Sequence, residues 1–295
     1  MHKMMIHLWF DTQAAEAADF YLNAFENSRR LGRTSLRGTP SGEVDVHTLE
    51  IEDLHLMLIS AGPAFRINPA VSFMVSLPTR EAVRSLWDAL SEGGQALMPL
   101  DRYDFSEYYG WIEDRFGVSW QIMHTGDRPI RTRIRPTLMF AGPKAGRAEE
   151  AVRFYGSVFG DSDIGMLSRY GENAPPPNTP EMLNYSEFVL GGQGFAAMDS
   201  AYTHDFDFNE AVSILVNCDT QEEIDRLTDE LSADPEAEQC GWVRDRFGVS
   251  WQLSPTALNE WMHDADPEAV ARLTQALLRM KRLDIAALEA AYRGA

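Results

Sequence analysis

The hydrophobic positions of the chain follow two periods, one typical of strands and one typical of helices. Short apolar runs such as HLWF (7–10) and TLMF (137–140) predict strands. Apolar residues at i, i+3, i+4, i+7 and i+8 predict amphipathic helices in 17–25 and 151–159. A second apolar run and a second amphipathic segment follow in each half of the chain, and Thr79 and Thr220 stand just before these second helices as predicted N-caps. The pattern therefore predicts a β-α-β-β-β unit twice in each half.

The two halves are copies of one another. The octapeptide DRFGVSWQ occurs at 114–121 and 245–252, within a 13-residue match that has ten identical positions. FYLNAFENS matches FYGSVFGDS and NPAVSFMV matches NEAVSILV, in the same order along the chain. Ordered matches with drifting spacing indicate a duplicated domain whose loops have changed length. Within the octapeptide, DRFG predicts a tight turn and VSWQ predicts the last strand of each copy.

The chain divides into three predicted segments, namely copy one at 1–126, copy two at 133–256 and a helical tail at 257–295. The basic, polar stretch 124–136 marks the boundary between the copies. Copy two is ten residues shorter before its Gly-Trp strand, which removes most of one strand. In the tail, Asp266 followed by a proline predicts a helix start, and we expect the tail to pack on the modules.

Composition narrows the classes of partner. The net charge is −19, with 45 acidic against 26 basic residues, so the surface repels phosphate backbones and we expect no nucleic-acid partner. The sequence has no apolar run of about 18 residues and no signal-peptide pattern, so we expect no membrane span. Cys218 and Cys240 are the only cysteines, so we expect no disulfide framework and a cytoplasmic location.

The chain resembles the vicinal oxygen chelate superfamily, which includes glyoxalase I, extradiol dioxygenases and bleomycin-resistance proteins. The resemblance rests on the tandem β-α-β-β-β units and on the motifs WFDTQAAEAADFY, GPAFRINPAVSF and GWIEDRFGVSWQ. Within the superfamily, these motifs resemble the PhnB-like group, often labelled 3-demethylubiquinone-9 3-methyltransferase. The resemblance implies an α+β fold of two tandem modules, each a pair of βαβββ units forming a curved, mostly antiparallel sheet, plus a C-terminal helical tail. Because open sheet edges need partners, we expect an intramolecular pseudo-dimer, which allows a monomer in solution.

The residues do not favour methyl transfer. An S-adenosylmethionine enzyme of the usual kind has a glycine-rich turn between a strand and a helix of a parallel sheet. The richest glycine stretch here, GGQG at 191–194, lies between two predicted strands and is typical of a hairpin turn. We therefore expect a protein that is not a genuine methyltransferase.

The resemblance also implies metal-ligand positions, which differ here from the metalloenzyme pattern. They map onto Met5, Glu50, Ser72 and Gln121 in copy one and onto Arg135, Glu187, Ser213 and Gln252 in copy two. Divalent metals prefer imidazole, thiolate or carboxylate ligands, and a positive arginine repels them. We expect no metal and no other cofactor. The alternative is that His7, on the strand face of Met5, binds zinc, nickel, iron or manganese together with Glu50.

The sequence leaves two candidate functions open. The first is a metal-free protein that binds a small organic molecule in a concave pocket; the second is a glyoxalase-like or dioxygenase-like metalloenzyme using copy one only. The sequence names no catalytic residue, and His7 and Trp9 are also typical packing groups. Copy one is expected to hold the principal pocket, because Tyr103, Phe105, Tyr108 and Tyr109 can line a cavity. The candidate pocket residues are His7, Trp9, Glu50, Ser72, Gln121, Glu187, Ser213 and Gln252.

Overall fold

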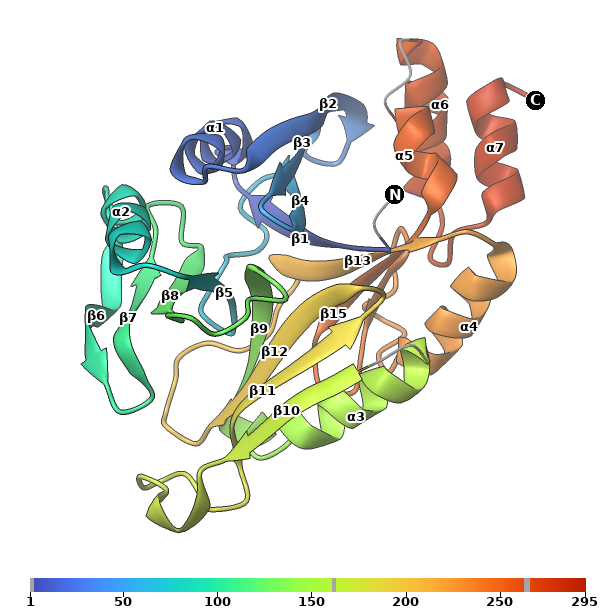
Figure 1. Ribbon diagram of the computed structural model, residues 1–295. Coiled ribbons are helices and arrows are strands. Elements are labelled where there is room, and N and C mark those ends of the chain that lie inside the picture. The colour runs from blue at the N-terminus through green and yellow to red at the C-terminus, as the bar shows by residue number, and fades with distance from the viewer. Residues whose placement is uncertain (1–2, 161–162, 263–265) are drawn as a thin grey trace.

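Two β-sheets form the centre of the molecule, and each takes strands from both halves of the chain (Figure 1). The computed structural model describes residues 3–160, 163–262 and 266–295. The first sheet has the order β14 (Trp242–Arg244), β15 (Ser250–Pro255), β13 (Val212–Cys218), β1 (Met4–Phe10), β4 (Leu54–Ser60), β3 (Gly42–Ile51) and β2 (Ser28–Thr39). The second sheet has the order β10 (Asp163–Arg169), β11 (Leu183–Leu190), β12 (Gln193–Ser200), β9 (Ile134–Ala141), β5 (Val71–Leu77), β8 (Ser119–His124), β7 (Ser106–Glu113) and β6 (Gln95–Tyr103).

The predicted β-α-β-β-β units are present, and the expected fold class is confirmed. Each unit has one long helix: α1 (Ala14–Ala24), α2 (Arg80–Leu90), α3 (Ala148–Phe159) and α4 (Gln221–Leu231). Short 3-10 turns, η1 (Gly142–Lys144) and η2 (Gly171–Asn173), flank α3 and β10. The fourth unit has lost one strand, as the shortened sequence predicts, because α4 is followed by turns and then directly by the short β14.

Side-chain hydroxyls begin the second helix of each copy. Thr79 accepts a hydrogen bond from the Ala82 amide, and Thr220 accepts one from the Glu223 amide. Such caps satisfy amide groups that have no partner within the helix. The two predicted helix starts are therefore confirmed.

The two units of a repeat lie in different sheets. Copy one contributes β1–β4 to the first sheet and β5–β8 to the second, while copy two contributes β9–β12 to the second and β13–β15 to the first. The antiparallel pairs β1–β13 and β5–β9 join the copies, with His7 opposite Ser213 and Ser72 opposite Thr137. Each sheet therefore carries residues of both copies.

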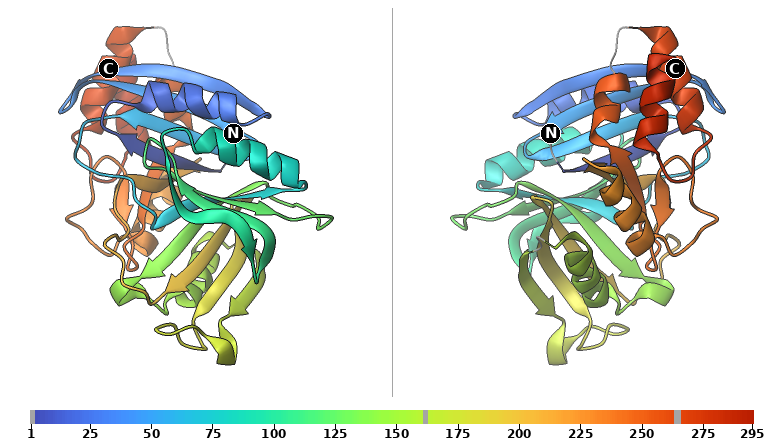
Figure 2. Two further views of the ribbon diagram at one scale, coloured as in Figure 1. Left: turned by 90° about the vertical axis from the view of Figure 1, so that its left-hand side faces the viewer. Right: turned by 90° about the vertical axis from the view of Figure 1, so that its right-hand side faces the viewer.

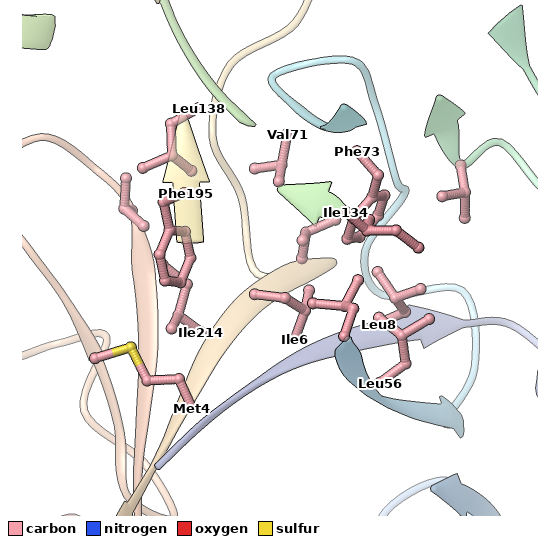
Figure 3. Close-up of a cluster of buried hydrophobic side chains, with 14 of the residues drawn as sticks. Met4, Ile6, Leu8, Leu56, Val71, Phe73, Ile134, Leu138, Phe195 and Ile214 are labelled. Atoms are coloured by element: carbon pink, nitrogen blue, oxygen red, sulfur yellow. The ribbon is translucent and has the colours of Figure 1, made fainter. Parts of the chain in front are cut away.

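An apolar core fills the space where the sheets meet (Figure 3). Met4, Ile6 and Leu8 of β1 are buried in it with Phe73 of β5 and Leu138 of β9. Because side chains alternate along a strand, the residues between them, such as His7, face the opposite side of the sheet. That opposite side carries the candidate pocket residues.

The C-terminal tail covers part of the first sheet. Its helices are α5 (Thr256–Met262), α6 (Pro267–Leu277) and α7 (Ile285–Arg293), and they lie beside β2 and β3 (Figure 2). The Thr34 hydroxyl donates to the Met262 carbonyl over 2.8 Å, and the Gln275 amide donates to the Gly38 carbonyl over 2.8 Å. The tail thus packs on the modules, as expected, although 263–265 lie outside the described residues. Within the described ranges, every helix is too short or too polar to cross a membrane.

Candidate functional site

A buried polar group lies at the centre of the second sheet. The Gln121 amide donates to the Ser72 hydroxyl over 2.8 Å and accepts from the Tyr109 hydroxyl over 2.7 Å. All three side chains are buried, and they come from neighbouring strands. Burial raises the pKa of Tyr109 well above its ordinary value, so its hydroxyl stays a donor. The first sheet repeats part of this arrangement, since Gln252 donates to Ser213 over 2.8 Å.

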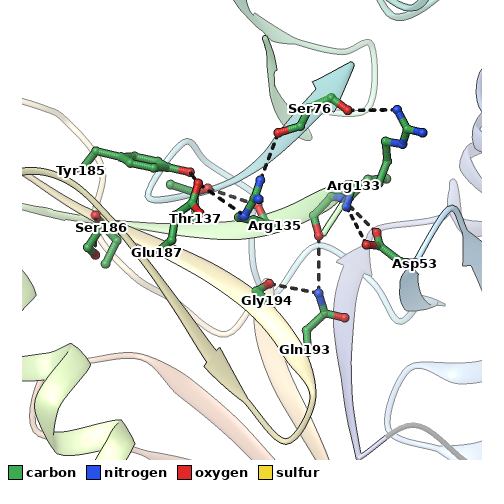
Figure 4. Close-up of polar contacts among 12 residues, drawn as sticks. Asp53, Ser76, Arg133, Arg135, Thr137, Tyr185, Ser186, Glu187, Gln193 and Gly194 are labelled. Atoms are coloured by element: carbon green, nitrogen blue, oxygen red, sulfur yellow. Dashed lines mark hydrogen bonds and ion pairs between the residues drawn. The ribbon is translucent and has the colours of Figure 1, made fainter. Parts of the chain in front are cut away.

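In the same sheet, an arginine of β9 faces a carboxylate of β11 (Figure 4). Arg135 of β9 is 8% exposed, and its Nη1 donates to the Ser76 hydroxyl over 3.0 Å. Its Nε lies 3.6 Å from Oε1 of Glu187. The Tyr185 hydroxyl also donates to Glu187, over 3.1 Å. Burial, and next the charge of Glu187, raise the pKa of Tyr185 well above its ordinary value.

These residues line a cavity of about 520 Å³. Arg128, Arg135 and Glu187 are its charged lining residues, and Gln121 also lines it. The aromatic lining residues are Phe105, Tyr109, Trp111, Tyr170 and Tyr185, and the methionines are Met74, Met98, Met123, Met166 and Met198. Ligand sites of this size usually combine apolar walls with a few convergent polar groups.

A second, smaller cavity of about 180 Å³ lies between the first sheet and the tail. His7, Trp9 and Gln252 line it from the sheet, and the tail contributes Leu258, Asn259, Met262, Leu277 and Leu283. His7 is 3% exposed, and burial lowers its pKa to about 3, so the ring is neutral at pH 7. Its Nδ1 has no hydrogen-bond partner among the described residues. Its ring meets the Trp242 ring edge-on at 5.5 Å.

The structure separates residues that the sequence assigned to one copy-one cup. Glu50 lies in the first sheet, whereas Ser72 and Gln121 lie in the second with Glu187 of copy two. The single-copy grouping is wrong because the units of each repeat belong to different sheets. Glu50 lines neither described cavity; it pairs with Arg29 over 2.9 Å and with His55 over 3.7 Å.

The pairing register also changes which carboxylates correspond. In the first sheet His7 lies opposite Met57, which lies opposite Thr48. In the second sheet Thr137 lies opposite Ala196, which lies opposite Glu187. Since HLWF aligns with TLMF, His7 corresponds to Thr137, and Glu187 therefore corresponds to Thr48. The sequence alignment placed Glu50 at this position, but Glu50 lies two residues further along β3, opposite His55.

The predicted pocket aromatics are only partly in the large cavity. Phe105 and Tyr109 line it, while Tyr103 stacks on Phe105 at 5.6 Å and Tyr108 lies under the Arg80 guanidinium. Trp9 lines the smaller cavity and donates its indole N–H to the Gly62 carbonyl over 2.7 Å. The large cavity thus belongs to both copies, not to copy one alone.

Several lining residues were not singled out from the sequence. Ser76 and Met74 share β5 with Ser72, and Met123 lies two residues after Gln121 on β8. Strand alternation from Ser72 and Gln121 would have found all three. Tyr185 and Arg128 carry no such signal, because their place depends on how the strands of two copies meet.

The implied metal site does not fit these residues. At the positions implied as metal ligands, the second sheet holds a guanidinium, a carboxylate paired with it, a hydroxyl and an amide. Within residues 3–160, 163–262 and 266–295, no group of three or more His, Cys, Asp or Glu side chains could hold a metal ion. His7 and Glu50 of the alternative site are on β1 and β3, with β4 between them.

Comparisons with known proteins agree with this architecture. A family model described as 3-demethylubiquinone-9 3-methyltransferase matches residues 2–123 and again 132–254. The PhnB protein from Bacillus cereus is 28% identical, over 41% of this chain and 98% of its own, with a TM-score of 0.39. Glyoxalase I from Zea mays is 12% identical, over 88% of this chain and 95% of its own, with a TM-score of 0.53. No match was found among curated proteins. With both copies matched, the chain belongs to the PhnB-like family that bears the 3-demethylubiquinone-9 3-methyltransferase description, within the vicinal oxygen chelate fold.

Proposed function

We propose that the protein binds a small organic molecule in the cavity of the second sheet, without a metal ion and without methyl transfer. The observation that carries this proposal is the convergence of Arg135, Glu187 and Gln121 on one cavity of about 520 Å³. That volume lies within the range of roughly 300–1,000 Å³ typical of small-molecule sites. The remaining walls are mainly aromatic rings and methionines, which offer apolar contact.

Metal-free binding is supported by the donors themselves. The Arg135 guanidinium lies 3.6 Å from Glu187, so a positive charge is already next to this carboxylate. The Gln121 amide is engaged with Ser72 and Tyr109, so neither end is free for a cation. The positive charge of Arg135 would repel a divalent ion from the carboxylate. The alternative pair has weaker support, since Glu50 lines neither described cavity.

The glycine-rich segment supports binding rather than methyl transfer. Gly191 and Gly192 connect β11 to β12, with φ of 53° and 81°. Two successive residues with positive φ form the tight turn of a hairpin, as the sequence predicts. A phosphate- or cofactor-binding turn would instead lead from a strand into a helix.

A thermal-shift screen of organic metabolites with and without EDTA tests the proposal. We expect at least one compound to raise Tm equally in both conditions, because ligand binding to the native state stabilises it. Met123→Trp, which fills the cavity, should abolish the shift. Leu97→Trp, at an exposed position on β6, is the matched control and should keep it. A shift that EDTA removes, or one that survives Met123→Trp, would contradict the proposal.

A further inference from the structure

We propose that the ligand of the second-sheet cavity carries one carboxylate on an apolar body, and that Arg135 binds that carboxylate. This inference rests on the proposed function. It adds the chemical class of the ligand and the residue that selects it.

The charges in the cavity favour an anion. Its charged lining residues are Arg128, Arg135 and Glu187, which together give a formal charge of +1. The whole chain has a net charge of −19, so this cavity is a positive region in an acidic protein. A partly desolvated positive cavity attracts negative ligands and disfavours cations. A single excess positive charge matches a carboxylate better than a doubly charged phosphate.

Arg135 is incompletely compensated by its neighbours. The 3.6 Å separation from Glu187 is longer than a hydrogen bond, and the Glu187 side chain is 37% exposed and shared with Tyr185. One guanidinium nitrogen donates to Ser76, while the group as a whole lines the cavity. A guanidinium has several N–H donors in a planar fork that fits a carboxylate in a bidentate manner. A buried cation of this kind gains most from an anionic partner.

The walls define the rest of the ligand. Five methionines line the cavity, and three of them, Met74, Met123 and Met198, lie on neighbouring or nearby strands of the sheet. Methionine side chains are flexible and polarisable, and they adapt to apolar groups of different shapes. Trp111 and Tyr170 add flat apolar surface. The cavity therefore suits an apolar, ring-sized body and discriminates mainly through its charged end.

The first sheet supplies the substitutions for a test. Its Met5 corresponds to Arg135, and its Thr48 corresponds to Glu187, so this fold already holds methionine and threonine at the two positions. Arg135→Met removes the proposed carboxylate partner. Glu187→Thr removes the competing carboxylate instead, so the two variants should change anion binding in opposite directions.

The experiment uses N-phenyl-1-naphthylamine, a neutral fluorescent dye, to report cavity occupancy in the full chain. Displacement by 1-naphthoate is compared with displacement by 1-naphthamide, its neutral isostere. We expect naphthoate to displace the dye at least ~10-fold more strongly. Arg135→Met should bring this ratio to about one while dye affinity stays within about twofold, and Glu187→Thr should raise the ratio.

The outcomes distinguish failure of the proposed function from failure of this inference alone. The proposed function, and this inference with it, is overturned if the dye does not bind the wild-type protein. It is also overturned if Met123→Trp leaves dye binding unchanged. A dye that binds while naphthoate and naphthamide compete equally overturns this inference alone. Equal displacement by inorganic phosphate, which has no apolar body, also overturns it. If Arg135→Met does not fold, the ratio in Glu187→Thr still decides, because an unchanged or lower ratio contradicts the proposed role of Arg135.

Discussion

Trp120 donates its indole N–H to the buried carboxylate of Asp114 over 2.9 Å. The same carboxylate accepts from the Tyr21 hydroxyl over 2.8 Å and from the Phe116 and Val118 amides over 2.8 and 3.0 Å. In copy two, Asp245 has the corresponding bonds from Tyr155, Trp251, Phe247 and Val249. Tyr21 belongs to the unit of the first sheet and Asp114 to the unit of the second. The repeated octapeptide therefore contains the anchor that ties the separated units of each repeat together.

Asp114→Asn is expected to destabilise the protein by about 2–4 kcal/mol. An amide can accept the two backbone bonds through one oxygen, but its NH₂ group would face the Trp120 and Tyr21 donors. Urea unfolding measures the loss, with Asp101→Asn, at an exposed position on β6, as the control. A loss below about 1 kcal/mol would show that the anchor contributes little beyond an ordinary hydrogen bond.

His7→Leu is expected to make stability less sensitive to acid. Burial lowers the pKa of His7 from its ordinary value of 6.5 to about 3, so the unfolded state binds a proton between these values and the native state does not. His7 therefore costs stability as pH falls below 6.5, by about 2 kcal/mol at pH 5. The leucine variant should lack this loss.

Urea unfolding at pH 7 and pH 5 measures the difference. Burial raises the pKa of Asp114 to about 6, so its contribution to stability declines as pH rises from about 4 to about 6. That opposite effect is present in wild type and His7→Leu alike and cancels in their comparison. An equal pH dependence in both proteins would mean that His7 is protonated in the native state.

Local structure was predictable from the sequence because local patterns determine it. Helical periodicity, the caps at Thr79 and Thr220, and the shortened segment before Trp242 all predict what the structure contains. The assembly of the sheets was not predictable from the sequence, because the pairing of β1 with β13 joins residues more than half the chain apart. An apolar strand pattern specifies which face is buried but not which edge it will join.

The candidate site was predictable only where it lies within one unit. Gln121 and Ser72 were found on neighbouring strands of one unit, and they do contact each other. Glu187 was expected to lie with Arg135, Ser213 and Gln252 of copy two. It does lie beside Arg135, but Ser213 and Gln252 are in the other sheet, and copy-one residues complete the wall of the cavity. The correspondence of Glu50 with Glu187 failed because a shift of two residues along a strand keeps the side chain on the same face and leaves no trace in the hydrophobic pattern.

Leu283→Ala is expected to loosen the tail without affecting the large cavity. Leu283 is 1% exposed, packs with Leu258, Leu273 and Leu288, and lines the smaller cavity. Truncating a buried leucine costs about 2–5 kcal/mol, because apolar contact is lost and a cavity remains. Urea unfolding should show this loss, while dye binding in the second sheet stays unchanged. Leu31→Ala, at a 42% exposed position, is the control and should have little effect.

A fragment of residues 1–126 is expected to dimerise or aggregate. In the full chain β1 pairs with β13 through residues such as Met4 opposite Val216, and β5 pairs with β9 through residues such as Val71 opposite Leu138. The fragment loses both partners and exposes two strand edges that belong in the middle of sheets.

A second copy of the fragment can replace both lost partners. By the repeat, β5 is the counterpart of β13 and β1 is the counterpart of β9, so β1 of one copy can pair with β5 of the other, and the reverse. Such a dimer is symmetric and reproduces the pairings of the intact chain. Size-exclusion chromatography with light scattering should report twice the fragment mass, or larger aggregates. A folded, monodisperse monomer would contradict the conclusion that each copy depends on the other for its sheets.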